Sequence, residues 1–209
     1  MTYELGVDLP SGAPPRVQRG TNLLVTGPPM VGKQRLALEL LAAGQRRGEG
    51  GLLVTTETPN ARVAEAYAGL ADDAGPPLRI VDAVGEGGGR EVNDRYAVEF
   101  VSSPGDLTGL GIAMNKAFDA FVAEGTDGVR VALDSLSTML TYLDAERVFK
   151  FLHVLTGRVS SVGGLGVYTL NTAAADPQAV GMLKNTVDGV VHLDDGEGGH
   201  VDGFDGVTG

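Results

Sequence analysis

The stretch from residue 27 to residue 34 carries the clearest chemistry in the chain. A short apolar segment precedes it and a helical pattern follows it, and its residues are Gly27, Pro28, Pro29, Met30, Val31, Gly32, Lys33 and Gln34. The two glycines let the backbone curl until its N–H groups face inward, the helix start adds a positive dipole, and the lysine adds a point charge. This Walker A pattern predicts a loop that binds phosphate groups. An ordinary turn between a strand and a helix is the alternative interpretation.

The residue after the lysine departs from the usual form of such a loop. Gln34 stands where Ser or Thr supplies a hydroxyl ligand for Mg²⁺. A glutamine amide is longer and uncharged, and it reaches a metal only through its carbonyl oxygen and with a different geometry. We therefore expect the loop to bind phosphate, while metal-assisted hydrolysis is impaired.

Carboxylates follow two of the predicted strands. Asp134 comes directly after the apolar segment 129–133, and Glu57 ends the Thr55-Thr56-Glu57 sequence at the end of the strand predicted over 51–55. An acidic residue at the carboxyl end of a strand beside a phosphate loop typically holds Mg²⁺, which favours Asp134 as a metal ligand. Two alternatives stay open. In the first, Asp134 only caps the helix that follows it. In the second, Glu57 binds a ribose hydroxyl as in dinucleotide-binding folds, although the loop lacks the Gly-x-Gly-x-x-Gly pattern of those folds.

The elements that must position these residues follow from the alternation of apolar patterns. Short apolar runs bounded by Gly, Pro, Asp or Asn predict strands at residues 23–25, 51–55, 79–81, 97–101, 129–133, 166–170 and 189–193. Apolar residues at helical spacing predict helices within 107–122 and 148–159. The alternation predicts an α/β fold of three layers, with helices flanking a mostly parallel sheet. Residues 85–94 and the glycine-rich stretch from Asp194 onward are expected to be surface loops.

Length and composition favour one globular domain and exclude several classes of function. The chain has 209 residues, a mass of 21.5 kDa, a net charge of −11, no Cys and only 4 Lys against 12 Arg. This acidity argues against nucleic acid as a partner, because phosphate backbones need a basic surface. Acidity with few lysines also favours a halophilic protein of a salt-rich cytoplasm. No apolar run is long enough to span a bilayer, so we expect a cytoplasmic protein without membrane insertion.

Histidines and acidic runs give little support for further metal sites. His153, His192 and His200 do not share the spacing of zinc ligands, and we interpret each as structural or solvated. The acidic, glycine-rich run 194–200 lacks the spacing of a calcium-binding loop and is typical of a solvated hairpin turn.

The order of the motifs resembles one known superfamily. A phosphate loop, then Thr55-Thr56-Glu57 after the next strand, then Leu133-Asp134-Ser135 as a Walker B pattern, is similar to the RecA/KaiC superfamily of ATPases. Segments 103–112, 136–140 and 149–155 are similar to KaiC-like proteins of haloarchaea. The resemblance implies a RecA-type P-loop domain over residues 21–195, with an N-terminal segment at 1–20 and a glycine-rich tail or hairpin at 196–209.

The resemblance also implies roles for particular residues. It implies ATP as the ligand of the 27–34 loop and Mg²⁺ as a cofactor that Gln34 places in doubt. Glu57 becomes the candidate general base that activates water, and Asp134 the candidate magnesium ligand. Asn171, after the strand predicted over 166–170, matches a polar position that senses the γ-phosphate.

Two functions compete at this point. The first is a slow Mg²⁺-dependent ATPase with a regulatory role, which would use Glu57 as its base. The second is a catalytically degenerate module that senses nucleotide or binds a protein partner without turnover. Active members of the superfamily commonly receive a Lys or Arg from a neighbouring subunit, yet no Lys or Arg follows Lys184 in this sequence, and His192 and His200 are its last basic residues. Self-association into a homo-oligomer is an expectation inherited from the resemblance.

Overall fold

A large mixed sheet organises the molecule. The computed structural model describes residues 2–10, 13–72, 75–85, 90–92, 95–173, 175–195 and 198–204. The strands are β1 (Thr2–Glu4), β2 (Arg16–Gln18), β3 (Asn22–Gly27), β4 (Gly50–Thr55), β5 (Leu78–Asp82), β6 (Arg90–Val92), β7 (Tyr96–Phe100), β8 (Val129–Asp134), β9 (Leu165–Asn171), β10 (Gly189–Leu193) and β11 (Gly199–Asp202). The helices are α1 (Lys33–Gln45), α2 (Asn60–Ala68), α3 (Leu107–Ala123), α4 (Leu136–Tyr142), α5 (Ala145–Ser161) and α6 (Pro177–Lys184).

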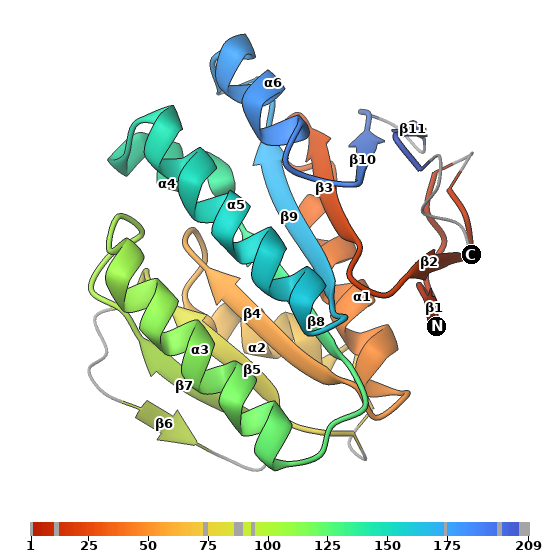
Figure 1. The fold of residues 1–209 in the computed structure, drawn as a ribbon, viewed down its shortest axis with the longest axis vertical. Helices are drawn as coiled ribbons and strands as arrows, with labels where there is room; N and C mark the ends of the chain where they lie inside the picture. The colour runs from red at the N-terminus through yellow and green to blue at the C-terminus, as the bar shows by residue number, and fades with distance from the viewer. Residues whose placement is uncertain are drawn as a thin grey trace.

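Nine of these strands form one sheet in the order β11-β10-β3-β9-β8-β4-β5-β7-β6 (Figure 1). The seven strands from β10 to β7 run parallel, while β11 and β6 pair antiparallel at the two edges. The central strands β3, β4 and β8 are buried at every position, which explains why their sequences are mostly apolar and do not alternate with polar residues. The predicted α/β class with a mostly parallel sheet flanked by helices is confirmed, and the seven predicted strand segments coincide with strands to within two residues at each end.

Helices cover both faces of the sheet and create two apolar cores. On one face, α3 and α5 pack side by side, as Figure 1 shows, and bury Phe118 and Leu152 against the strands. On the other face, α1 and α2 bury Leu38, Leu41 and Tyr67 in the second core. The sheet is thus the middle layer of three, as the apolar periodicity predicted.

Short edge strands are where the sequence prediction was wrong. The interval 85–94, expected to be a loop, contains β6, which pairs with β7. The glycine-rich stretch after Asp194 contains the short strand β11, which pairs with β10 as a hairpin. This outcome agrees with the expectation of a hairpin turn there, although the strand itself was not predicted. Residues 86–89, 93, 94, 196, 197 and 205–209 of these intervals lie outside the described residues. Strands of three or four residues carry too few positions to show an alternating pattern, so the sequence alone could not reveal them.

The N-terminal segment is tied to the core by a buried arginine. β1 and β2 form a separate two-stranded antiparallel sheet. Arg130 of β8 is fully buried and donates to the backbone carbonyls of Glu4, Leu5 and Leu40 at 2.7–2.9 Å. Its Nε donates to the Glu49 carboxylate at 2.6 Å, which balances the buried charge.

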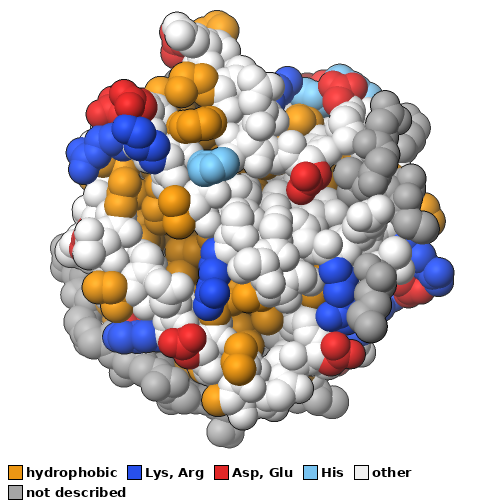
Figure 2. All heavy atoms as spheres, viewed as in Figure 1, with side chains coloured by type: hydrophobic (Ala, Val, Ile, Leu, Met, Phe, Trp, Pro, Cys, Tyr) orange, Lys and Arg blue, Asp and Glu red, His pale blue; other side chains and the backbone are white. Residues whose placement is uncertain are grey.

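The surface over α3 and α5 carries an apolar groove with basic side chains along it. In the view of Figure 2, hydrophobic side chains gather between the helices of this face. Phe118 and Leu155 line the groove together with Arg147, Lys150 and Arg158. Among the residues that the structure describes, no helix combines the length and the apolar character needed to cross a bilayer.

Candidate functional site

Parallel strands bring the predicted site residues to one edge of the sheet. Gly27 at the end of β3 is the register partner of Asn171 at the end of β9. Thr55 at the end of β4 is the register partner of Asp134 at the end of β8. The carboxyl ends of these four neighbouring strands therefore meet, which is where open α/β sheets bind their ligands.

A cavity of about 530 Å³ opens at this edge. Most of the predicted site residues line it, namely Pro29, Met30, Gly32, Lys33, Gln34, Glu57, Asp134 and Asn171. Gly27, Pro28 and Val31 belong to the same loop but do not line the cavity. Its volume lies within the range of small-molecule sites, roughly 300–1,000 Å³.

Two glycines give the loop its shape for different reasons. Gly27 lies so close to β10 that a Cβ placed on it would come 2.4 Å from the carbonyl oxygen of Leu193. Gly32 is the N-cap residue of α1 and has a φ of 92°, although nothing lies near its missing side chain. Met30 also has a positive φ, 63°, and its side chain is fully exposed. A left-handed conformation at a non-glycine residue costs free energy, so the fold holds Met30 in place at the mouth of the cavity.

Lys33 turns its ammonium group onto the loop that precedes it. The Nζ atom donates hydrogen bonds to the backbone carbonyls of Gly27 and Pro28. Burial lowers the pKa of Lys33, and the carboxylates of Asp134 and Glu57 oppose this effect. Lys33 is therefore a cation that both site carboxylates attract. Arg35 also lines the cavity, but its guanidinium pairs with Glu39.

Asp134 has both carboxylate oxygens engaged. Thr169 donates to Oδ1 at 2.5 Å and Gln34 Nε2 donates to Oδ2 at 2.6 Å. Burial raises the pKa of Asp134 above its ordinary value, and the two hydrogen bonds act in the opposite direction. The alternative that Asp134 caps the next helix does not hold, because Ser135 is the N-cap of α4 and its hydroxyl accepts the N–H of Thr138.

Gln34 connects the loop directly to Asp134. Its amide nitrogen donates to Asp134 and also to the hydroxyl of Thr58 at 3.0 Å. In the usual loop a hydroxyl oxygen stands at this position and an oxygen-ligated Mg²⁺ lies between it and the acidic residue. Here an N–H donor replaces the oxygen ligand and satisfies the carboxylate directly. The residues present thus do not fit the magnesium ion that the fold family implies.

Glu57 is an exposed carboxylate at the same cavity. The hydroxyl of Ser135 donates to Oε2 of Glu57 at 2.9 Å. The adjacent Thr56 fixes the backbone of Ser135 with two hydrogen bonds. The Thr56 hydroxyl accepts the Ser135 N–H and donates to the Ser135 carbonyl oxygen, each at 2.8 Å. The Thr-Thr-Glu sequence therefore fixes one carboxylate against the turn that follows β8.

Asn171 lies at the cavity with its side chain turned along its own backbone. Its Oδ1 accepts the N–H of Ala173 at 3.0 Å, and its backbone N–H donates to the hydroxyl of Ser137 at 2.7 Å. The amide is thereby oriented, and its Nδ2 atom is the group that it can offer to a ligand.

Several hydroxyl side chains line the cavity that the sequence analysis did not single out. They are Thr58, Ser135, Ser137, Thr138 and Thr141. Four of them follow Asp134 within seven residues, where β8 runs into α4. The capping pattern of a serine just before a helix is the signal that could have found Ser135.

The comparisons with known proteins agree with this architecture. The crystal structure of the KaiC-like protein PH0186 from Pyrococcus horikoshii OT3 matches with a TM-score of 0.63 at 18% sequence identity, and the match covers 93% of this chain and 81% of that one. The chain therefore has the RecA-type fold of KaiC-like proteins. It belongs to a family of unknown function, DUF7504, whose model matches residues 20–193.

A curated protein is related to this chain in sequence. The UPF0273 protein MK0039 of Methanopyrus kandleri is 28% identical over 180 residues, which are 82% of this chain and 68% of the relative. None of the three comparisons assigns a reaction to the cavity. The haloarchaeal affiliation and the roles of Gln34, Glu57 and Asp134 stay predictions.

Proposed function

We propose that this protein is a nucleotide-binding regulatory module that takes a nucleoside triphosphate, with ATP as the first ligand to test, without requiring Mg²⁺. The observation that carries the proposal is the direct hydrogen bond from Gln34 to Asp134 inside a cavity that also holds Lys33. The loop supplies backbone N–H groups at a helix start and a lysine, which are the parts needed to hold phosphate groups.

The same hydrogen bond argues for binding without efficient turnover. In P-loop enzymes the metal ion bridges the terminal phosphates and neutralises the charge that develops during transfer. Gln34 Nε2 supplies a hydrogen-bond donor near Asp134, but it does not carry the full positive charge of a metal ion. The rate enhancement that a bridging cation supplies would be missing, and the nucleotide would act as a bound signal.

A slow ATPase is the second candidate, and Glu57 favours it. Its carboxylate lies at the cavity, is fixed by Ser135 and is exposed to solvent. A carboxylate in such a place can orient a water molecule for attack on a terminal phosphate. This candidate requires that phosphate release depends on Glu57 and on Mg²⁺.

The output of a regulatory module needs a partner, which we propose to be a second copy of this chain or another protein. A net charge of −11 continues to argue against nucleic acid. Light scattering of the protein with and without ATP tests the homo-oligomer directly. A change in molar mass that depends on ATP and disappears in Lys33→Ala would support a nucleotide-controlled assembly.

The deciding experiment is a calorimetric titration of ATP into the protein in concentrated KCl, once with Mg²⁺ and once with a chelator. We expect the same affinity in both conditions, and we expect Lys33→Ala to abolish the heat. Lys150→Ala is the matched control, because it removes an exposed lysine that pairs with its helical neighbour Glu146. Equal loss in both lysine variants would refute the assignment of the loop.

Phosphate release separates the two candidates. The module predicts no release above the level of Lys33→Ala, with or without Mg²⁺. Release that needs Mg²⁺ and disappears in Glu57→Gln, while ATP binding persists, would replace the first candidate by the ATPase. The absence of any ATP binding in either condition would refute both.

A further inference from the structure

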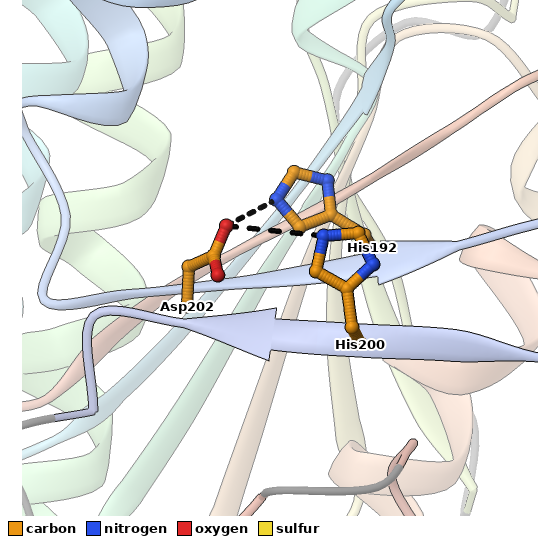
Figure 3. Close-up of side chains that lie close together, drawn as sticks. All are labelled: His192, His200 and Asp202. Atoms are coloured by element: carbon orange, nitrogen blue, oxygen red, sulfur yellow. Dashed lines mark hydrogen bonds and ion pairs between the residues drawn. The ribbon is translucent and has the colours of Figure 1, made fainter.

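The last hairpin of the sheet brings together three side chains that the sequence keeps apart. His192 lies on β10, and His200 and Asp202 lie on β11, and all three point to the same side of the hairpin (Figure 3). Nε2 of His192 lies 3.1 Å and Nε2 of His200 lies 3.9 Å from Oδ2 of Asp202. The two imidazole rings stack with their centroids 4.3 Å apart.

The strand register explains this cluster, which the spacing of the histidines along the sequence does not reveal. His192 and His200 are direct partners across the antiparallel pair. Asp202 lies two residues beyond His200, so the two-residue period of a strand places it on the same face. Two histidines eight residues apart would lie far from each other along one extended strand. They lie side by side here because a turn between them joins two paired strands.

We propose that His192, His200 and Asp202 form a binding site for a divalent transition-metal ion, for which Zn²⁺ is the probe. Two imidazole nitrogens and one carboxylate oxygen are a ligand set that zinc accepts, and solvent can supply the fourth ligand. This site lies outside the ATP cavity, so the proposal does not depend on the proposed function.

The distances fit such an ion after small side-chain movements. Ligand atoms about 2.0–2.2 Å from a tetrahedral ion lie about 3.3 Å from one another. The three candidate ligand atoms already lie within 4.8 Å of one another. The side chains of His200 and Asp202 are about 60% exposed, whereas that of His192 is only 17% exposed. The first two can therefore rotate toward a fixed His192 without disturbing the core.

A hydrogen bond behind His192 prepares it to act as a ligand. Nδ1 of His192 lies 2.8 Å from the hydroxyl oxygen of Thr26, and that hydroxyl can donate its own hydrogen to the carbonyl of Val191 at 3.5 Å. In the structure Nε2 carries the ring hydrogen and donates to Asp202, while Thr26 donates to Nδ1. A metal ion at Nε2 would move the ring hydrogen to Nδ1, where the Thr26 hydroxyl accepts it and turns its own hydrogen toward the Val191 carbonyl. Metal-binding histidines commonly have such a partner on the second nitrogen, because it fixes the tautomer and the ring orientation.

The test is a titration of the full chain with Zn²⁺, followed by calorimetry, together with Co²⁺ as a spectroscopic probe of the same site. We expect one ion per chain and the visible absorption of Co²⁺ bound by nitrogen and oxygen ligands, lost on adding Zn²⁺. His200→Ala and Asp202→Ala change exposed side chains, so the fold should tolerate them. Each should weaken Zn²⁺ binding by at least ~100-fold, more than the loss of an outer-shell partner.

Three controls make the result decisive. His153→Ala removes the third histidine of the chain from the exposed face of α5 and should leave Zn²⁺ binding unchanged. Lys33→Ala should also leave it unchanged, which separates this site from the ATP cavity. Thr26→Val should weaken binding by ~10-fold while Thr26→Ser preserves it, since only the hydroxyl matters. Zn²⁺ binding that His200→Ala and Asp202→Ala leave intact, or that is absent from the unmodified chain, would overturn the proposal.

Discussion

The amide of Gln34 donates a hydrogen bond to the carboxylate of Asp134 across 2.6 Å, and this contact connects the start of α1 to the end of β8. The partners are 100 residues apart in the sequence. The position that would present a hydroxyl oxygen to a metal ion presents an N–H group, and the acidic residue that would hold the metal accepts it. The loop and the acidic residue thus meet through a direct contact between two side chains.

Replacing Gln34 by threonine should restore a requirement for Mg²⁺. Gln34→Thr frees Oδ2 of Asp134 and returns a hydroxyl ligand to the loop, so ATP should bind at least ~10-fold more tightly with Mg²⁺ than with a chelator. Gln34→Ala is the control, because it removes the amide without adding a ligand and should show a much smaller preference. Calorimetry of both variants beside the unmodified protein measures the ratio. A tenfold preference already present with Gln34 would contradict the proposed role of this contact.

The positive φ angles in the loop predict how two substitutions change the free energy of unfolding. Met30 has a φ of 63° and a fully exposed side chain, so Met30→Gly relieves backbone strain without removing packing. We expect the free energy of unfolding to rise by up to about 1 kcal/mol, since the gain from strain exceeds the entropy that glycine adds to the unfolded chain. Gly32→Ala should have the opposite effect, a loss of about 1–2 kcal/mol, because its φ is 92°. Urea denaturation measures both changes, and equal signs would show that the loop conformation differs.

Parallel strands explain why so much of the site could be predicted from the sequence. β3, β4 and β8 are buried on both faces and appear as apolar runs, and the polar residue that ends each run must lie at one edge of the sheet. Lys33, Glu57 and Asp134 were therefore placed near one cavity before any contact was known. Their chemical roles are a separate matter, which the experiments with ATP test.

Contacts between side chains distant in the sequence could not be predicted in the same way. The bond between Gln34 and Asp134 depends on rotamers and on the height of α1 above the sheet, which no local pattern encodes. The cluster of His192 and His200 depends on the register of a hairpin whose second strand, β11, has only four residues. Hydrophobic periodicity is informative only over longer segments, so both features needed the structure.

Arg130 should be among the most sensitive positions of the fold. Its guanidinium is fully buried, pairs with Glu49 and donates to three backbone carbonyls. Arg130→Met leaves the Glu49 charge buried without its partner, and we expect the free energy of unfolding to fall by about 3–5 kcal/mol. Arg16→Ala is the control, since Arg16 pairs with Glu4 at the surface and should cost less than about 1 kcal/mol. Urea denaturation measures both losses. Similar losses in the two variants would mean that the buried pair contributes no more to the free energy of unfolding than the surface pair does.

Asp82 should make folding depend on pH. Burial by itself would raise the pKa of this carboxyl, but hydrogen bonds from Gly85, Asn60 and Val84 outweigh burial and lower the pKa below its ordinary value of 3.8. The folded protein therefore binds a proton at Asp82 less readily than the unfolded chain does. The stability that Asp82 contributes is complete above the unfolded value and is lost as the pH falls through the folded one.

Asp82→Asn tests this dependence, because asparagine keeps the shape of the side chain but cannot ionise. At neutral pH we expect the variant to be less stable by about 2 kcal/mol, the size of hydrogen bonds to a charged group. The difference from the unmodified protein should shrink as the pH falls below about 3.8, where the carboxyl of Asp82 becomes protonated. Urea denaturation over this pH range measures it, with the exposed Asp119→Asn as a control that should cost little at any pH. A difference that stays constant with pH would show that ionisation of Asp82 is not the source of the stability lost in the variant.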